Sequence, residues 1–223
     1  MEFTFGIITG GNLDTRVINS IYHQNIPEDK FEIIVVGGDY IPEYPDVKHI
    51  EFGESQRPLW ITRKKNMITK NAKFENIVFL HDYYFLWRSW YEGFLKFGND
   101  WDVCMNKIQN LDGSRFRDWI ICYDREFENR DFSLSEVRRG KPTRYLPSYD
   151  YKKTKNMYVS GGYWVAKKYV MEKEPLNENL MWEQGEDYEW SERVLWSGNY
   201  NYKMNTHSTV QTLKDKRLSA EVL

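Results

Sequence analysis

Two adjacent carboxylates, Glu186 and Asp187, are the residues best suited to acid–base chemistry in this sequence. They directly precede a helical pattern that runs from Tyr188 to Trp196 and stops at Gly198. A helix N-terminus presents unpaired backbone N–H groups and the positive end of the helix dipole, which favour an ionised carboxylate. Such a carboxylate can accept a proton from a substrate hydroxyl at neutral pH. The same position also suits a helix cap, which is the alternative interpretation of either residue.

Three further features carry residue types that suit ligand binding. Asp82 directly follows an apolar run, Gly161 and Gly162 lie in a turn of small residues, and His207 lies near the C-terminal end. Glycines allow a backbone to approach a ligand closely. Each feature alone also has an ordinary structural interpretation: a cap at a strand end, a simple turn, and a surface or core histidine.

Alternating strand and helix patterns must position these residues. Strands are predicted at 3–9, 31–36, 47–52 and 76–80, with one helix that Asn12 or Asp14 can cap and another after Pro58. This alternation predicts an α/β fold with a mostly parallel sheet. Ligands bind such sheets at the carboxyl ends of the strands, where Thr9, Asp39 and Asp82 fall.

The second half of the sequence is less regular. A helix is predicted at 90–97 and a strand at 101–105. The stretch from Arg138 to Lys155 holds seven basic residues against one acidic residue, Asp150. It is interpreted either as a solvated loop or as a mobile flap over an anionic ligand. The last residues, 208–223, are expected to form a short helix.

Composition excludes some classes of function. With 31 basic and 33 acidic residues the formal net charge is −2, so no global field indicates nucleic acid or an acidic membrane as a partner. No run is long enough to span a membrane, and no signal peptide is recognised, so a cytoplasmic location is expected. Cys104 and Cys122 are expected to be buried thiols. The aromatic content of 17% suits both sugar stacking and a packed core.

Read together, these features resemble the nucleotide-sugar glycosyltransferases of the GT-A fold, especially the family 2 group. The resemblance covers nearly the whole chain and rests on Ile7-Ile8-Thr9, Lys65-Asn66, Asp82, Ser160-Gly161-Gly162, Glu186-Asp187 and His207. It implies a Rossmann-like, mostly parallel sheet flanked by helices, with an irregular acceptor-side second half. It also implies a single domain over residues 1–223, with a nucleotide-binding half at 1–105 and an acceptor-side half at 106–223.

The resemblance further implies a role for each matching residue on the donor side. Asp82 and His207 would bind a metal ion, and an imidazole ligand favours Mn²⁺ over Mg²⁺. Such an ion would neutralise the departing nucleoside diphosphate. Contacts to the nucleotide are expected from Thr9, Gly10, Gly11, Asp39, Arg63, Lys65 and Asp82.

On the acceptor side, the resemblance implies that Asp187 is the general base. Glu186 and Trp182 would position the acceptor or the donor sugar, and Gly161 and Gly162 would contact substrate. One departure from the family pattern concerns the metal motif: its usual Asp-x-Asp is His81-Asp82-Tyr83 here, which leaves a single carboxylate.

The sequence thus predicts an inverting, metal-dependent glycosyltransferase. It would move a sugar from a nucleoside-diphosphate sugar to a hydroxyl of a glycan or other glycoconjugate. Two alternatives stay open: a catalytically degraded module that binds nucleotide sugars or glycans, which the altered metal motif favours, and a nucleotidyltransferase. The latter is expected to carry a glycine-rich, basic signature after the first strand, which residues 10–14 lack. Donor sugar, base, acceptor and oligomeric state stay open.

Overall fold

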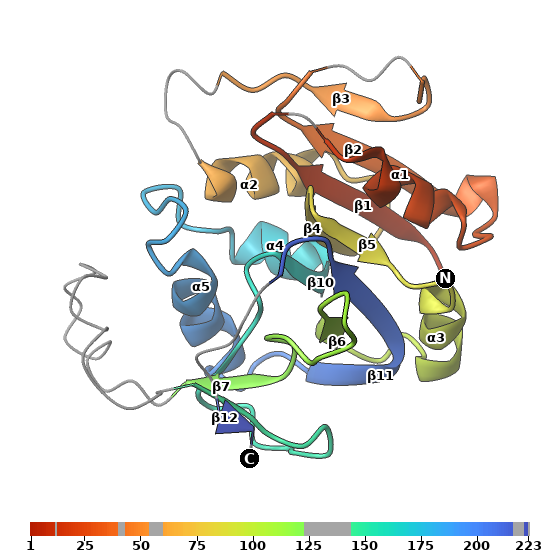
Figure 1. Cartoon of the computed structure of the whole chain (residues 1–223). Helices are drawn as coiled ribbons and strands as arrows, with labels where there is room; N and C mark the ends of the chain where they lie inside the picture. Colours follow the sequence, from red (N-terminus) through yellow and green to blue (C-terminus); the bar gives the residue numbers. More distant parts are fainter. Residues whose placement is uncertain (12, 40–42, 54–59, 123–143, 216–220, 223) are drawn as a thin grey trace.

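An eight-stranded mixed sheet forms the centre of this computed structural model, with strands in the order β3-β2-β1-β4-β10-β6-β11-β5 (Figure 1). The structure describes residues 1–11, 13–39, 43–53, 60–122, 144–215 and 221–222. Three neighbouring pairs at one side are parallel and come from the first part of the chain: β1 (Phe3–Ile8), β2 (Phe31–Val36), β3 (Lys48–Ile50) and β4 (Asn76–His81). The βαβ alternation predicted for the first part of the chain is therefore confirmed.

The other side of the sheet mixes directions. β10 (Tyr163–Lys167) lies antiparallel between β4 and β6 (Val103–Gln109). β11 (Tyr202–Thr212) runs parallel to β6 and antiparallel to the edge strand β5 (Tyr84–Leu86). A strand from the second half of the chain is thereby inserted beside β4, so both halves contribute to one sheet.

Helices cover both faces of the sheet. On one face, α2 (Ile61–Asn71) packs over β1, where a Cβ on Gly6 would lie 2.3 Å from Ile68, and α4 (Lys168–Lys173) lies beside α2. α5 (Glu186–Leu195) shares this face through Trp190, whose ring lies 5.9 Å from that of Trp164. The opposite face carries α1 (Thr15–Tyr22), preceded by its N-cap Asp14, and α3 (Trp90–Phe97); a single 3₁₀ turn, η1, spans Glu28–Lys30.

A smaller four-stranded sheet lies beside α5. Its order is β12 (Glu221–Val222), β8 (Arg144–Leu146), β7 (Ile120–Cys122) and β9 (Met157–Tyr158). Leu146, Ile120 and Tyr158 form a small apolar cluster with Tyr188 of α5. α5 is therefore packed between the two sheets, and this fixes the position of its first turn.

One predicted element is wrong. Residues 208–223 were expected to form a short helix, but residues up to Thr212 belong to β11. The side chains of Ser208, Val210 and Thr212 are fully buried, and this alternation suits a strand that pairs with neighbours on both sides. Pairing partners distant in sequence therefore decide the structure here.

Other expectations have mixed outcomes. Cys104 and Cys122 are free and buried, as predicted. Of the basic stretch from Arg138 to Lys155, residues 138–143 lie outside the described residues, and Arg144 to Leu146 form β8. Within the described part of the chain, no helix is long and apolar enough to cross a membrane.

Candidate active site

Gly161 is the central contact of the candidate site. Its N–H donates to Asp187 Oδ2 at 2.9 Å, and its carbonyl accepts from Lys65 Nζ at 2.6 Å. A Cβ at this position would lie 2.9 Å from Asp187 Oδ2 and 3.0 Å from Glu186 Oε1. A side chain at this position would displace both carboxylates, so the close approach expected of this turn is made by the protein's own acidic pair.

The first turn of α5 presents those carboxylates. The residue before the helix, Gly185, occupies the N-cap position with φ +71°, in the left-handed region that favours glycine, and no side chain caps the helix there. Asp187 Oδ1 accepts the N–H of Tyr188 at 2.9 Å. The Asp187 carboxylate thus accepts hydrogen bonds from two backbone N–H groups, and its side chain is partly exposed. The N-cap interpretation of Glu186 and Asp187 therefore does not hold.

Glu186 differs from Asp187 because it is buried. Burial and the neighbouring Asp187 charge raise the pKa of Glu186 to about 7, against the opposing effect of Lys65. Glu186 therefore keeps its proton to a higher pH than the helix terminus alone predicts. Desolvation outweighs the helix dipole at this depth.

Lys65 lies beneath this pair. Its side chain is 1% exposed, and its ammonium lies 4.3 Å from the ring centroid of Trp164. Burial lowers the pKa of Lys65 to about 8, while Glu186 and Asp187 oppose the change. Lys65 was expected to reach base or phosphate, but the structure engages its ammonium with Gly161 and places it below the acidic pair.

A second group of residues lies at the carboxyl ends of β1 and β4. The Thr9 hydroxyl lies 2.7 Å from Asp82 Oδ2 and accepts the N–H of Gly11 at 3.2 Å. The Thr9 carbonyl accepts from Lys64 Nζ at 2.5 Å. Gly10 and Gly11 are exposed beyond this contact. Thr9 therefore joins the turn after β1 to the turn after β4.

The turn after β2 approaches the same place. Gly38 has φ +67°, and a Cβ on it would lie 2.5 Å from the Gly11 carbonyl oxygen and 2.8 Å from Thr9 Cγ2. Asp39 follows and is exposed. Thr9, Gly10, Gly11, Asp39 and Asp82 are thus brought to one edge of the sheet, as the sequence predicts. Arg63 is half-exposed and pairs with Glu178 at 2.7 Å.

Gly162 links the two groups of residues. Its carbonyl accepts the N–H of His81, at the end of β4, at 2.9 Å. A Cβ on Gly162 would lie 2.4 Å from the Tyr84 ring. The Gly161–Gly162 turn therefore contacts α5 on one side and the turn that carries Asp82 on the other. Trp182, in the loop before α5, is 47% exposed and leaves its ring accessible to a ligand.

The residues present do not fit the metal ion that the resemblance implies. His207 lies on β11 at an irregularity between Asn205 and Thr209, and its carbonyl contacts Gly93 of α3. α3 packs on Phe3, at the start of β1, whereas Asp82 contacts Thr9 beyond the end of that strand. The two predicted ligands are therefore not brought together. Among the described residues, no group of three or more His, Cys, Asp and Glu could hold a metal ion.

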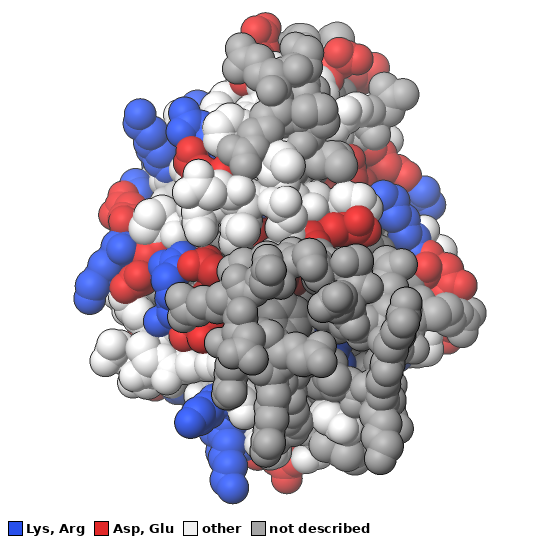
Figure 2. All heavy atoms as spheres, turned by 90° about the vertical axis from the view of Figure 1, so that its left-hand side faces the viewer, with Lys and Arg blue, Asp and Glu red and all other residues white. Residues whose placement is uncertain are grey.

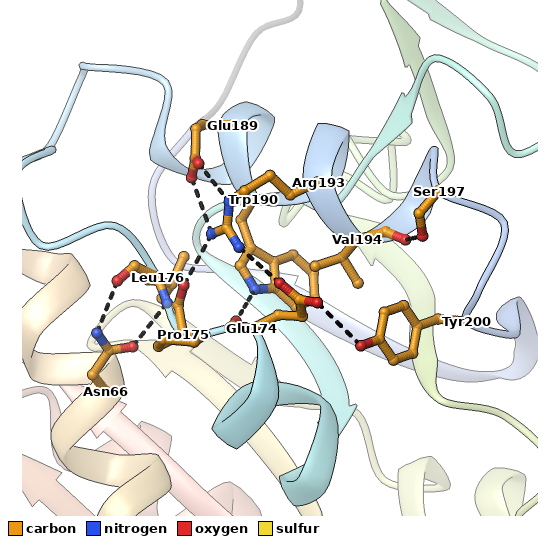
Figure 3. A network of polar contacts seen from close by, with 10 residues as sticks. All are labelled: Asn66, Glu174, Pro175, Leu176, Glu189, Trp190, Arg193, Val194, Ser197 and Tyr200. Atoms are coloured by element: carbon orange, nitrogen blue, oxygen red, sulfur yellow. Dashed lines mark hydrogen bonds and ion pairs between the residues drawn. The ribbon is translucent and has the colours of Figure 1, made fainter.

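A polar network anchors α5 behind the site (Figure 3). Arg193 reaches back to Glu189 in its own helix and to Glu174 and the Pro175 carbonyl in the preceding segment. Asn66 of α2 exchanges two hydrogen bonds with the backbone of Leu176, at 2.9 and 3.0 Å. The helices that carry Lys65 and Asp187 are thereby joined through one segment of chain.

Two lysines near this edge were missed from the sequence. Lys64 was overlooked although its neighbour Lys65 was selected, because a lysine is usually exposed, whereas Lys64 is buried here and donates to the Thr9 carbonyl. Lys214 follows β11, and its Nζ lies 4.1 Å from the centroid of the Tyr83 ring. Its place next to Asp82 could not be found while residues 208–223 were interpreted as a helix.

The molecular face at the carboxyl ends of the strands shows no broad charge of one sign among the coloured residues (Figure 2). Acidic and basic side chains lie dispersed around a band of other residues. For the described residues, this agrees with the near-neutral net charge.

Comparisons with known proteins support the fold. No protein-family model and no curated protein sequence matches the chain. A crystal structure of S. aureus TarS 1-349 is similar with a TM-score of 0.59 at 14% identity, over 94% of this chain and 60% of that chain. A crystal structure of S. aureus TarS is similar with a TM-score of 0.61 at 15% sequence identity, over 96% of this chain and 37% of that chain. The structure of TarS 1-349 in complex with UDP-GlcNAc has a TM-score of 0.58 at 14% sequence identity, over 97% of this chain and 60% of that chain.

The TarS structures include complexes with UDP and with UDP-GlcNAc. This chain spans less than two thirds of the length of each TarS chain compared. The similarity extends over nearly all of this chain, across both the regular first half and the irregular second half. The chain therefore has the same α/β architecture as TarS, the GT-A type of fold that its sequence predicts.

Proposed function

We propose that this protein is a glycosyltransferase that moves a sugar from a nucleoside-diphosphate sugar to a hydroxyl group of a glycan or glycoconjugate. The observation that carries the proposal is the contact between Gly161 and Asp187. It holds a partly exposed carboxylate beside the sheet edge that Thr9 and Asp82 form. The fold shared with TarS, which binds UDP and UDP-GlcNAc, supports a nucleotide sugar as the ligand.

In this proposal the nucleotide lies at the carboxyl ends of β1, β2 and β4. The exposed turn at Gly10 and Gly11 would contact the nucleoside, and Asp39 and Asp82 would accept hydrogen bonds from ribose or base. UDP-GlcNAc is the first donor to test, because it is bound in a structure with the same fold.

The proposed reaction is a single displacement with inversion. The acceptor oxygen attacks the anomeric carbon while the bond from that carbon to the diphosphate breaks, and the diphosphate takes the electron pair. Asp187 accepts the proton of the attacking hydroxyl. Its two hydrogen bonds from backbone N–H groups fix the carboxylate in place. Trp182 would stack on the acceptor or the donor sugar.

Manganese is not included in this proposal, because Asp82 and His207 lie apart. The altered motif His81-Asp82-Tyr83 favours a second candidate function: a module that binds nucleotide sugars without turnover. The two candidates differ in their products. Incubation with a panel of nucleotide sugars and glycan acceptors, with assay of released nucleoside diphosphate, tests them. Acceptor-dependent release supports the transferase. Tight donor binding without release, with every acceptor, would instead support the binding module.

A further inference from the structure

A leaving nucleoside diphosphate needs a positive charge beside it. This requirement rests on the proposed function. Asp82 is itself acidic and has its Oδ2 within 2.7 Å of the Thr9 hydroxyl. Lys65 is buried below Gly161, and Lys64 donates to the Thr9 carbonyl. Because the predicted metal ligands do not come together, a basic side chain at this edge is the alternative source of that charge.

Lys214 is held at the required place by the end of β11. The N–H of Leu213 donates to the Tyr83 carbonyl at 2.7 Å, so the chain after β11 lies on the turn that follows Asp82. The Thr212 hydroxyl then accepts the Lys214 N–H at 3.2 Å and donates to the Lys214 carbonyl at 3.0 Å. These contacts fix the backbone of Lys214 one residue from the last sheet hydrogen bond.

The Lys214 side chain is exposed and rests on an aromatic face. Its Nζ lies 4.1 Å from the centroid of the Tyr83 ring, the residue next to Asp82. No carboxylate among the described residues forms an ion pair with it. An exposed cation–π contact is weak, so the flexible stem can leave the ring for a stronger partner. A diphosphate bound at this edge would be such a partner.

We propose that Lys214, rather than a divalent metal ion, supplies the positive charge that binds the donor diphosphate and stabilises it as it leaves. As the bond between the anomeric carbon and the diphosphate oxygen breaks, the electron pair goes to that oxygen. The Lys214 ammonium neutralises the added charge without transferring a proton. Asp82 and Thr9 are then left to hydrogen-bond to hydroxyl groups of the donor.

Calorimetric titration of the full chain with UDP, in EDTA and in Mn²⁺, tests this. The dissociation constant should be the same in both conditions. Lys214→Met should raise it about 10- to 100-fold, the usual effect of losing a charge-assisted hydrogen bond, and Lys214→Arg should restore most of the affinity. Lys203→Met is the matched control: Lys203 pairs with Asp100 at 2.8 Å and lies at the start of β11, whereas the end of β11 pairs with Tyr84.

Two results would overturn the inference while leaving the proposed function intact. One is UDP binding that weakens tenfold or more in EDTA. The other is wild-type affinity in a Lys214→Met protein whose thermal unfolding matches that of Lys203→Met. If the wild-type chain binds none of a panel of nucleoside diphosphates, in either EDTA or Mn²⁺, the proposed function fails and the inference fails with it.

Discussion

Gly161 places opposite charges on the two sides of one peptide turn. Asp187 accepts its N–H and Lys65 donates to its carbonyl, while a Cβ on Gly161 would lie 3.0 Å from Glu186 Oε1. In the proposed mechanism the two carboxylates have different roles. Asp187 is partly exposed and would accept the proton of the acceptor hydroxyl, whereas Glu186 is buried and its charge is favoured by Lys65.

Asp187→Asn tests the role of the exposed carboxylate. An amide cannot take a proton, so transfer should fall about 10²–10⁴-fold, the usual contribution of general base catalysis. Donor affinity should change little, because Asp187 acts on the acceptor. Asn has one carbonyl oxygen for two backbone N–H groups, so stability should fall by about 1 kcal/mol. Steady-state kinetics and calorimetry measure the two effects.

The control for that experiment is Glu172→Gln, which removes one negative charge from the exposed side of α4. Its transfer rate should equal that of the wild type. Normal transfer by Asp187→Asn would assign the proton transfer to another group, and Glu186 would be the next residue to replace.

Glu186→Gln tests the buried carboxylate through the pH dependence of stability. Because the pKa of Glu186 rises from 4.5 to about 7 on folding, the folded protein keeps a proton that the unfolded chain loses. Its contribution to stability is therefore complete below pH 4.5 and falls as the pH rises toward 7. Glutamine stays neutral. Relative to the wild type, the variant should gain on the order of 3 kcal/mol between pH 4.5 and pH 8.

Urea unfolding of both proteins at pH 4.5, 6, 7 and 8 measures this difference. Parallel stability curves for the two proteins would show that Glu186 has an ordinary pKa. If the free energy of unfolding of the wild type rises toward pH 8 relative to that of the variant, the pKa of Glu186 is lowered on folding, which contradicts the prediction.

At the scale of elements, α2 holds the chain that leads into α5. Trp60 and Thr62, at the start of α2, donate to the carbonyls of Glu178 and Leu180 at 2.7 Å, and Asn66 binds both backbone groups of Leu176. The loop that follows contains left-handed residues at Glu183 and Gly185. The position of the first turn of α5 therefore depends on contacts from a helix more than 100 residues earlier in the chain.

Asn66→Ala should lower the free energy of unfolding by about 1–3 kcal/mol, because it leaves the N–H and carbonyl of Leu176 without their partner. Asn71→Ala is the matched control on the same helix. Asn71 contacts the Met67 carbonyl within α2 and the side chain of Lys48, so its loss should cost less. Chemical denaturation measures both. Equal costs for the two variants would show that the α2 contact with Leu176 is not a special anchor.

Helix and strand predictions were most accurate where local patterns decide the structure. The run Phe31–Val36 is apolar from Ile33 onward and forms β2, and the glycines after it have positive φ. α2 places the apolar residues Ile61 and Ile68 on its buried side as the helical spacing predicts. β11 was missed because its strand character depends on β6 and β5, which are far away in sequence.

At the scale of the whole molecule, the candidate site was predicted in part. The order of strands along the chain was enough to bring Thr9, Asp39 and Asp82 to one edge, because parallel strands end on the same side. The acidic pair at the start of α5 was also found. The pairing of Asp82 with His207 was not borne out by the fold, because the register of β11 places His207 beside α3.

The burial of Lys65 and Glu186 could not be derived from sequence either. Both residue types are usually exposed. Their environment depends on Trp164, from β10, and on the Gly161 turn, which the fold inserts between α2 and α5. The same long-range arrangement places Lys214 above Tyr83.

The most direct test of the central claim is the anomeric configuration of the product. The full chain is incubated with UDP-GlcNAc, or with whichever donor shows acceptor-dependent release, and the reaction is followed by proton NMR. A single displacement with Asp187 as base predicts a new glycosidic signal with the configuration opposite to that of the donor sugar, growing as the donor signal decays. A product that retains the donor configuration, or a donor signal that stays constant with every acceptor, would contradict the account.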